Sequence, residues 1–472
     1  MNSPYIEELI NDQSFRAEDL VNSTLDVSEN TILIINNNSE KRLDELIEEA
    51  LRKNVKKIIT SENCSKQNNK IIKVKNYEEI INTLLLKISP SFLDKDYFGI
   101  TGTNGKTTSG YYLSQLLNEN SLFIGTNEDN LFKNITNEKH LTTPKLFNIV
   151  KLLRDQEYEN TKNIILEVSS HALDQNRLKG IKFKVSGFTN LSQDHLDYHQ
   201  NMQSYFQSKL KLFSEDMSES FVYIDSEWGK KIKSSTNVNS FSIGTNKKNN
   251  ICIKKLITKK DRFDLSFEIE GNSYEVSVPL VGPESHLNYL LALSMAYLSN
   301  IKNLDKLIDK SNNLKNPKGR YEKIKYKNNN DIVIDFAHTP ESIYQAISFS
   351  KKNYDKVYVI LGAGGDRDKD KRLLMGKAAN NADKIIITND NPRNENEEEI
   401  AKGILKGVNL NKDTEVILDR REAIARGIDN LHKDSVLLIL GKGHEKTQEF
   451  KNGFIEFSDK EEVKKIIMEK IW

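Results

Sequence analysis

The chain has 472 residues, and its 69 lysines and arginines nearly balance its 68 aspartates and glutamates. A chain of this length is expected to form about three domains. The formal net charge of +1 argues against a nucleic acid or a membrane surface as partner. No apolar run approaches membrane-spanning length, no basic and apolar leader is seen, and Cys64 and Cys252 lack metal-ligand spacing. We therefore expect a cytoplasmic protein without disulfides or membrane insertion.

Residues 1–95 are predicted to form a small α/β domain, because strand-like and helix-like runs alternate along them. These runs lie at 31–35, 40–53, 57–60, 70–74 and 77–88. The residues of this domain indicate no chemistry by themselves. Residues 89–96 are predicted to be a linker.

The strongest functional pattern is a glycine-rich turn, TGTNGKTT, between a predicted strand and a predicted helix. Glycines let backbone N–H groups point at one anion, and the helix adds its positive N-terminal end. Lys106 would face the outer phosphates of ATP or GTP, and the Thr107 hydroxyl would bind Mg²⁺. The spacing departs from the general P-loop, since Gly102 lies only three residues before Gly105 and Ile100 stands where that pattern has glycine. The alternative is an ordinary glycine-rich turn with a solvated lysine.

Residues 96–315 are predicted to form a central domain with a mostly parallel sheet, because buried runs alternate with helical ones. From 250 to 280 the hydrophobic period changes to two, which indicates an antiparallel insert or edge. A helix is expected at 287–298. The expected parallel strands lie at 97–100, 121–125, 163–168, 185–190 and 221–224.

Two polar clusters follow strands of this central domain. Glu167 ends a buried strand, where an acid beside a P-loop suits a Mg²⁺ ligand or a water-orienting group, the alternative being a helix N-terminal acid. The donors that come next suit a polar anionic substrate; they are Ser169, Ser170, Gln175 and Arg177. The second cluster suits a divalent ion; it contains Asp194, His195, Asp197 and His199. Lys209 follows on a helix and, taken alone, is most simply a surface lysine.

Residues 316–472 are predicted to form a second, Rossmann-like α/β domain, set apart by the turn at 316–320. Each expected strand is followed by a polar turn and a helix, except between the third and fourth. Asp335 suits a ribose hydroxyl, and two glycines before Asp366 favour close approach of a ligand, the alternative being a solvated loop. The expected strands lie at 332–335, 357–361, 384–388, 415–418 and 436–440, and their ends, where open α/β sheets bind ligands, carry the motifs DFAHTPES, LGAGGDRDKDKRLLMG, TNDNPR and LGKGHEKTQ.

Together these motifs resemble the Mur ligase family, the ATP-dependent ligases that build the peptide of bacterial cell walls. The resemblance runs from about Gly99 to Glu445 and is carried by TGTNGKTT, EVSSHALDQNRL, DHLDYH, DFAHTP, GGDRDK, DNPR and GKGHE. Folylpolyglutamate synthases share the fold and the loop type, but they are not expected to carry DNPR and GKGHE in this order. The resemblance implies three domains, which bind a UDP-sugar, ATP and an incoming amino acid, and a monomer is expected.

The resemblance also implies a reaction. ATP phosphorylates the terminal carboxylate of UDP-MurNAc-L-Ala-D-Glu to an acyl phosphate, and an amine of meso-diaminopimelate attacks it to form an amide. The implied catalytic residues are Lys106, Glu167, His195 and Lys209, and Mg²⁺ would be held by Thr107, Glu167, His195 and a carbamylated Lys209. The implied nucleotide contacts are Gly102, Thr103, Asn104, Gly105, Lys106, Thr107, Thr108, Asn288, Arg320 and Asp335.

Substrate contacts follow from the resemblance in the same way. Arg393 of DNPR would bind the distal carboxylate of meso-diaminopimelate, because a guanidinium favours a carboxylate and repels the ammonium of lysine. The UDP-MurNAc-dipeptide would be held by Ser23, Thr142, Thr143, Ser169, Gln175 and Arg177. The amino acid would be held by Arg367, Asp390, Asn391, Pro392, Arg393, Gly441 and Glu445.

Two motifs depart from the family's pattern. The uridine-contacting D-S-R segment is reduced to Ser23 between Asn22 and Thr24, and the adenine-side G-x-F-N-x-x-N motif is reduced to its first glycine and to Asn288. One alternative function is a Mur-type ligase that adds L-lysine or another amino acid. The other is a nucleotide-binding protein of the same fold without ligase activity, against which the intact lysines of the two motifs argue.

Overall fold

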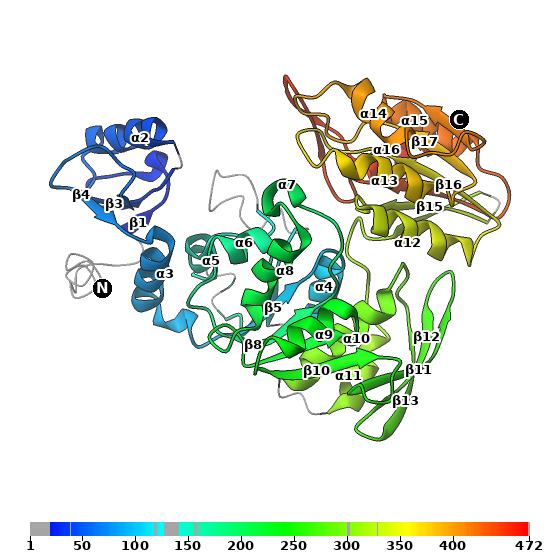
Figure 1. Ribbon diagram of the computed structural model, residues 1–472, viewed down its shortest axis with the longest axis horizontal. Helices are drawn as coiled ribbons and strands as arrows, with labels where there is room; N and C mark the ends of the chain where they lie inside the picture. Colours follow the sequence, from blue (N-terminus) through cyan, green and yellow to red (C-terminus); the bar gives the residue numbers. More distant parts are fainter. Residues whose placement is uncertain are drawn as a thin grey trace.

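The computed structural model describes residues 19–37, 39–117, 120–126, 141–154, 158, 160–299, 303–327 and 329–470. The first 18 residues of the predicted domain 1–95 lie outside this description. Three main sheets follow one another along the chain, and Figure 1 shows them as three units, the N-terminal one at the left and the C-terminal one at the upper right. Within the described residues, no helix has the length and apolar character needed to cross a membrane.

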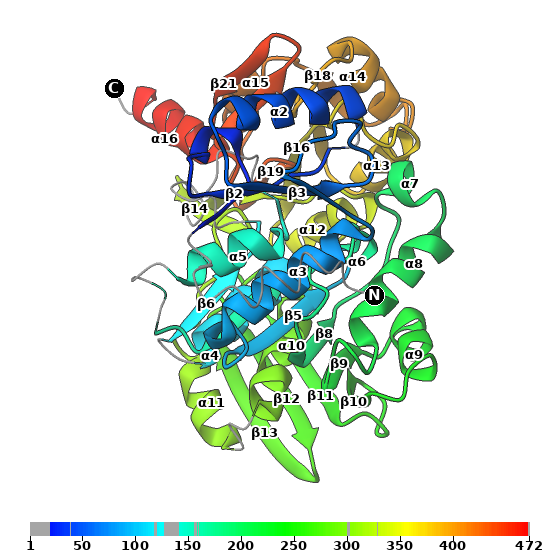
Figure 2. The ribbon, with the colours of Figure 1, turned by 90° about the vertical axis from the view of Figure 1, so that its left-hand side faces the viewer.

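The N-terminal unit is a four-stranded parallel sheet in the order β1-β2-β3-β4. Helix α2 (Glu40–Arg52) begins after Ser39, whose Oγ accepts a hydrogen bond from the Arg42 N–H. Helix α3 (Tyr77–Ile88) leaves this unit and packs against α5 (Leu146–Leu153) of the central unit, as Figure 2 shows from the side. The strands are β1 (Leu20–Val21), β2 (Ile32–Ile34), β3 (Lys57–Ser61) and β4 (Ile71–Val74).

A nine-stranded sheet in the order β13-β12-β11-β10-β9-β8-β5-β7-β6 forms the central unit, parallel from β6 to β11 and antiparallel beyond. The carboxyl ends of its parallel strands therefore share one edge. The strands are β5 (Asp96–Thr101), β6 (Ser121–Ile124), β7 (Asn163–Glu167), β8 (Phe183–Phe188), β9 (Ser220–Ile224), β10 (Asn239–Gly244), β11 (Ile251–Thr258), β12 (Phe263–Ile269) and β13 (Asn272–Val278). The remaining helices are α4 (Lys106–Leu117), α6 (Ser170–Asp174), α7 (Leu196–His199), α8 (Met202–Leu210), α9 (Glu227–Ser234), α10 (Ser285–Leu298) and α11 (Leu304–Ser311).

Strand β5 is apolar throughout because both of its faces are covered. Phe98 and Ile100 pack with Tyr112 and Leu113 of α4, which itself lies along α10. Tyr97 points to the other face and belongs to the core that α3 and α5 share. Burial on both faces fixes the register of β5 and thereby the position of the glycine-rich turn that follows it.

The C-terminal unit is a six-stranded sheet in the order β14-β15-β19-β16-β17-β18, parallel except for β14. Helices α12, α13 and α14 cover one face, and α15 and α16 cover the other. The strands are β14 (Glu322–Tyr326), β15 (Asn330–Asp335), β16 (Lys356–Leu361), β17 (Lys384–Ile387), β18 (Asp413–Val416), β19 (Ser435–Leu440) and the separate hairpin β20 (Thr447–Phe450) with β21 (Gly453–Glu456). The helices are α12 (Pro340–Lys351), α13 (Asp370–Ala379), α14 (Glu397–Leu405), α15 (Arg420–Asp429) and α16 (Asp459–Glu469).

The structure differs from the sequence prediction in several elements. Strands β10 and β14 were not predicted from the sequence, and β14 is short and only partly buried, so its hydrophobic pattern is weak. The predicted absence of a helix between the third and fourth strands of the C-terminal unit is wrong, since α14 lies there. The first turn of α14 is Glu-Glu-Glu, which masks the apolar face formed by Ile400, Ala401 and Ile404.

Candidate active site

The glycine-rich turn connects β5 to α4 and passes through space that a side chain would fill. A Cβ on Gly102 would lie 1.9 Å from Thr189 Oγ1, and one on Gly105 would lie 2.4 Å from Asn288 Oδ1. Gly105 also has a φ of 86°, which residues with a Cβ rarely adopt. Asn190 supports the turn from the neighbouring strand, because its Oδ1 accepts a hydrogen bond from the Asn104 N–H at 2.9 Å. The turn is therefore held in one shape by packing as well as by glycine.

Three cations gather at this turn, and we call Lys106, Lys209 and Arg320 the loop cations. Lys106 Nζ donates to the carbonyl oxygen of Gly102 at 3.0 Å and to the next carbonyl at 2.8 Å. Lys209 Nζ donates to the same Gly102 oxygen at 2.9 Å. Arg320 Nη2 donates to Thr107 Oγ1 at 2.9 Å. Within the part of the chain that the structure describes, no loop cation forms an ion pair with a carboxylate.

Two lysine side chains on one carbonyl oxygen cannot both stay protonated without cost. Burial and the nearby Lys106 ammonium hold the pKa of Lys209 well below its usual range, and Lys209 is only 1% exposed. Burial also lowers the pKa of Lys106. This pair therefore favours a neutral Lys209 amine, or an additional negative charge bound at the turn.

Glu167 ends β7 at the same edge of the sheet. Its Oε1 accepts from the Thr126 N–H at 2.8 Å and its Oε2 from Thr126 Oγ1 at 3.1 Å, so both oxygens are fixed. Among the described residues, no group of three or more His, Cys, Asp or Glu side chains is arranged to hold a metal ion. Thr107, Glu167 and His195 offer oxygen and imidazole donors, which fit an Mg²⁺ ion shared with phosphate oxygens rather than a closed protein cage.

Asp194 connects the central and C-terminal units. Its Oδ2 lies 3.4 Å from His195 Nε2 and 3.8 Å from His338 Nε2, and its Oδ1 lies 3.6 Å from Lys371 Nζ. Burial alone would raise the pKa of Asp194, but hydrogen bonding from His338 and the charge of Lys371 hold that pKa well below its usual range. Burial lowers the pKa of His195 to about 3, so its imidazole stays neutral near pH 7 and can bind a metal ion.

A small cavity of about 80 Å³ opens beside the turn, on the α10 side. Asp335 holds the backbone there, because its carboxylate accepts from the Tyr321 N–H at 2.5 Å and from the Ala337 N–H at 2.8 Å. Burial raises the pKa of Asp335. The predicted nucleotide contacts that line this cavity are Asn104, Gly105, Thr108, Asn288, Arg320 and Asp335.

The C-terminal wall of the site is built from loops that pack on one another through glycines. A Cβ on Gly364 would lie 2.9 Å from Arg393 Nη1, and one on Gly365 would lie 1.9 Å from the Pro392 carbonyl oxygen. The close approach predicted for these glycines is therefore made by the DNPR segment of the chain itself. Arg393 has a φ of 54°, and Arg393 Nη1 donates to the Gly365 carbonyl at 2.7 Å.

A buried polar network orders the same wall. Lys442, which is fully buried, donates to Asn391 Oδ1 at 3.1 Å and to Glu445 Oε2 at 2.8 Å. Asn391 Nδ2 donates to the same Glu445 oxygen at 3.0 Å. Glu449 on β20 contributes its N–H to Asn391 Oδ1 and its carboxylate to Arg393 Nε. The DNPR and GKGHE motifs thus form one hydrogen-bonded unit.

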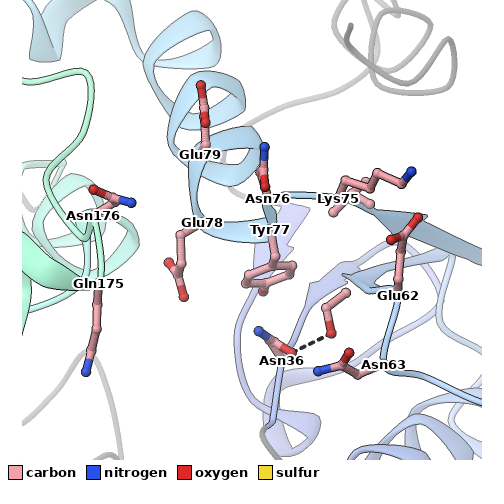
Figure 3. Close-up of a pocket in the computed structure, with 12 residues that line it drawn as sticks. Asn36, Glu62, Asn63, Lys75, Asn76, Tyr77, Glu78, Glu79, Gln175 and Asn176 are labelled. Atoms are coloured by element: carbon pink, nitrogen blue, oxygen red, sulfur yellow. Dashed lines mark hydrogen bonds between the residues drawn. The ribbon is translucent and has the colours of Figure 1, made fainter.

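A larger cavity, of about 620 Å³, lies between the N-terminal and central units. Figure 3 shows Gln175 and Asn176 of the central unit on one side of it, with side chains of the N-terminal unit opposite. Asn36 Oδ1 accepts from Ser61 Oγ at 2.7 Å at the base of this cavity. Its lining residues of the N-terminal unit carry amide, hydroxyl and charged groups at the ends of β2, β3 and β4.

The main cavity, of about 340 Å³, lies between the carboxyl ends of the central and C-terminal sheets. It brings together most of the predicted site residues. Those that line it are Thr103, Asn104, Gly105, Lys106, Thr107, Thr142, Glu167, Ser169, His195, Arg320, Arg367, Asp390, Asn391, Arg393, Gly441 and Glu445.

Several predicted site residues lie outside the lining of the main cavity. Thr143 is fully buried, and its Oγ1 donates to the Glu167 carbonyl at 2.7 Å, so it orders the strand end. Arg177 donates to the Thr143 carbonyl at 2.9 Å and to Gln175 Oε1. Ser23 Oγ accepts from the Leu25 N–H and caps a short turn. Gly102 belongs to the turn but does not line the cavity, and Lys209 binds the Gly102 carbonyl oxygen from below. Pro392 is buried against Gly365.

Sequence reasoning missed Lys371 and Glu449 as members of the site. Lys371 stands in a run of alternating charges, and Glu449 stands in an unremarkable hairpin, so neither has a local pattern that marks it. Their roles come from partners about 175 and 55 residues away, Asp194 and Arg393 respectively.

Comparison with known proteins agrees with this geometry. The Mur ligase middle domain family matches residues 100–296, and the family described as Mur ligase, glutamate ligase domain, matches residues 319–443. A protein of Rickettsia rickettsii named UDP-N-acetylmuramoyl-L-alanyl-D-glutamate--2,6-diaminopimelate ligase is 35% identical over 441 residues, which is 90% of each chain. The chain belongs to the Mur ligase family.

Further relatives have the same name. A protein of Aquifex aeolicus (strain VF5) so named is 37% identical over 375 residues, covering 78% of this chain and 77% of that protein. A solved structure of a UDP-N-acetylmuramoyl-L-alanyl-D-glutamate--2,6-diaminopimelate ligase has a TM-score of 0.64 at 26% identity and covers 96% of this chain and 95% of its own. The Thermotoga maritima MurF ligase in complex with ADP shares the fold, with a TM-score of 0.65 at 18% identity over 98% of this chain and 99% of its own.

Membership in the Mur ligase family confirms two predictions made from the sequence. The fold class is the predicted one, with a large, mostly parallel central sheet and a separate C-terminal α/β sheet. The chain is an ATP-dependent ligase, as are the Mur ligases it matches over most of its length.

Proposed function

We propose that this ligase joins meso-diaminopimelate to UDP-N-acetylmuramoyl-L-alanyl-D-glutamate, with cleavage of ATP to ADP and phosphate, in peptidoglycan synthesis. The proposal rests on one observation, a single cavity whose two walls carry different cationic side chains. Lys106 and Arg320 lie on one wall, and Arg393 of the DNPR segment lies on the other. A polyphosphate fits the first wall, and an amino acid with a distal carboxylate fits the second.

The proposed reaction has two chemical steps. The carboxylate of the dipeptide attacks the γ-phosphorus of ATP, so that ADP leaves and an acyl phosphate forms. An amine of the amino acid then attacks the acyl carbon, loses a proton, and expels phosphate to leave an amide. Lys106 and Arg320 would neutralise the charge that develops on the transferred phosphoryl group.

Metal binding is part of the proposal. Thr107, Glu167, His195 and a carbamylated Lys209 would hold Mg²⁺, which would screen the phosphate charges from the attacking carboxylate. A carbamate forms when a neutral amine adds to carbon dioxide, and the low pKa of Lys209 makes that neutral amine available. The carbamate would also give Lys209 a negative charge beside Lys106, in place of a second positive charge at the same carbonyl oxygen.

The sugar nucleotide would extend from the cavity in Figure 3 to the main cavity. Gln175 borders the first cavity and is tied to Arg177, while Thr142 and Ser169 line the second. These residues would hold successive parts of the UDP-MurNAc-dipeptide, and the N-terminal, central and C-terminal domains would divide near residues 95 and 315. Ser23 stays a predicted contact of the uridine.

The amino acid would be held by the C-terminal wall. Arg393 would bind its distal carboxylate, and the acids of the wall would bind its ammonium groups. We also propose that the enzyme acts as a monomer, in the cytoplasm where ATP is available. The wall residues that would contact the amino acid are Arg367, Asp390, Asn391, Arg393, Gly441 and Glu445.

The proposal is tested by ATP turnover with purified UDP-MurNAc-L-Ala-D-Glu. ADP should form rapidly only when meso-diaminopimelate is added, and the product should gain the mass of that amino acid less one water. L-Lysine should support little turnover at the same concentration. ADP formation that never depends on an amino acid, or a preference for lysine, would refute the proposed function.

A further inference from the structure

Glu449, near the end of β20, makes three hydrogen bonds to the DNPR segment. Its N–H donates to Asn391 Oδ1 at 3.0 Å, and its carbonyl accepts from the Arg393 N–H at 3.0 Å. Its Oε2 accepts from Arg393 Nε at 2.8 Å. The two backbone bonds persist in any variant of Glu449, so substitution isolates the contribution of the carboxylate.

The Arg393 guanidinium is fixed at two points. Nε donates to Glu449, and Nη1 donates to the Gly365 carbonyl at 2.7 Å. Within the described residues, Nη2 has no hydrogen bond to another group of the protein. Because a guanidinium is rigid and planar, anchors at two of its nitrogens fix the direction of its remaining N–H donors.

Arg393 lines the main cavity, whereas Glu449 does not, so the Glu449 carboxylate acts on a ligand there through the Arg393 side chain that it binds. We propose that Glu449 is a positioning residue for acceptor specificity, which holds the Arg393 guanidinium so that Nη2 receives the distal carboxylate of the incoming amino acid. This inference rests on the proposed function, because it assumes an acceptor with a distal carboxylate.

The pair is suited to positioning rather than to stabilising the fold. The side chains of Arg393 and Glu449 are 19% and 25% exposed, and ion pairs of such exposure add little to stability. Arg393 also has a left-handed backbone, a conformation that persists where surrounding contacts hold it. Without the Glu449 carboxylate, the guanidinium keeps one anchor and gains rotational freedom that the acceptor must then restrict.

The test compares three variants with the wild-type enzyme. Glu449→Ala removes the anchor, and Glu449→Gln keeps an amide oxygen that can accept the same Nε–H bond. Glu456→Ala, on the exposed neighbouring strand β21, is the matched control. The measurements are kcat and KM for meso-diaminopimelate, KM for ATP and for the sugar nucleotide, the kcat/KM for L-lysine, and the thermal midpoint of unfolding.

Glu449→Ala should raise KM for meso-diaminopimelate about tenfold with little change in kcat, because one charged hydrogen bond to the binding group is lost. The kcat/KM for L-lysine should stay the same, so the preference for meso-diaminopimelate over lysine should fall by the same factor. Glu449→Gln and Glu456→Ala should stay within about twofold of the wild type.

Other outcomes would overturn the inference. An unchanged or lowered KM for meso-diaminopimelate in Glu449→Ala would show that the carboxylate is idle or competes with the acceptor. A Glu449→Gln variant as weak as Glu449→Ala, or a rise in all three KM values with a lower thermal midpoint, would show a general structural role. A wild-type enzyme that does not use meso-diaminopimelate would instead refute the proposed function.

Discussion

The two walls of the main cavity carry positive charge in different ways. On the central wall, the loop cations donate to carbonyl and hydroxyl oxygens and, in the described residues, to no carboxylate. On the C-terminal wall, Arg393, Lys442 and Arg372 each pair with a glutamate. The loop cations therefore have no carboxylate partner until a ligand brings negative charge, whereas these three cations of the C-terminal wall are neutralised in advance.

Because of this difference, we expect the two walls to have different functions. Cations without carboxylate partners attract a highly charged anion, and the repulsion between these cations is relieved when the anion binds. Cations already paired with carboxylates attract an anion only weakly. Their N–H donors keep a fixed direction, however, and can select a ligand by its shape. We expect substitutions on the central wall to affect the chemical step, and substitutions on the C-terminal wall to affect the choice of amino acid.

The largest effect should come from Lys106→Ala on the central wall. Removing this cation should lower ligation about 10³-fold, because charge on the transferred phosphoryl group is no longer neutralised. The fold should stay intact, as judged by circular dichroism. The control is Lys233→Ala, an exposed lysine of α9. Near-normal turnover of Lys106→Ala would remove the basis for assigning a phosphate role to the turn.

Lys209→Ala should be the next most severe, with activity lowered about 10²-fold. If a carbamate is the working group, short carboxylates such as acetate should restore part of the activity by replacing its negative charge. Intact-mass measurement under carbon dioxide should show the added carboxyl group on the wild type and not on the variant. A fully active wild type with an unmodified lysine would contradict the carbamate.

Arg393→Ala on the C-terminal wall should act on selection instead. Loss of a charged hydrogen bond costs about 1.5–3 kcal/mol, which is about one to two decades in kcat/KM for meso-diaminopimelate. KM for ATP should stay unchanged, and lysine should not become a good acceptor, since removing repulsion adds no contact. A competition assay with equal concentrations of both amino acids measures the preference, with Arg262→Ala as the exposed control. An unchanged preference would show that this wall does not select.

The smallest effect concerns stability and pH. Hydrogen bonding from Arg372 lowers the pKa of Glu395 from 4.5 to about 2. A pKa that is lower in the folded state means that the charged Glu395 stabilises the fold above pH 4.5, and that this contribution is lost as the pH falls towards 2. Glu395→Gln should therefore destabilise the protein by about 1–2 kcal/mol at pH 7.

That difference should shrink as the pH of the unfolding measurement falls from 4.5 towards 2, because the glutamate of the unfolded chain is protonated in this range while the folded one becomes protonated only near pH 2. Glu398→Gln, at an exposed position three residues away, should show no such change. A Glu395→Gln deficit that is the same at pH 7 and pH 3 would mean that the ion pair with Arg372 is not its source.

Much of the fold could be predicted because its elements have strong local patterns. The runs around Phe98, Ile165 and Leu438 are apolar on both faces and predict buried parallel strands, and the change of period after residue 250 predicts the antiparallel strands β11 to β13. Helix α14 was missed because its acidic first turn interrupts the apolar period. Local patterns therefore served best where burial dominates the sequence.

The candidate site was predictable where one motif carries the chemistry. The glycine-rich turn and the DNPR segment could be recognised from the sequence, because glycines or charged residues occur at fixed spacing after a predicted strand. Thr143 shows the limit of this approach, since its position in a polar motif does not reveal that it is fully buried beneath the cavity. Lys371 and Glu449 could not be found, because only tertiary packing brings them to Asp194 and Arg393.

The backbone passes from the central unit to the C-terminal unit once, through residues 312–321. Polar contacts also join the two walls, such as the bond from His444 Nε2 to the Thr126 carbonyl at 3.0 Å and the Asp194–Lys371 ion pair. Water can replace such contacts without exposing a hydrophobic core. The two units can therefore move apart about one tether while each stays folded, which would open the main cavity between them.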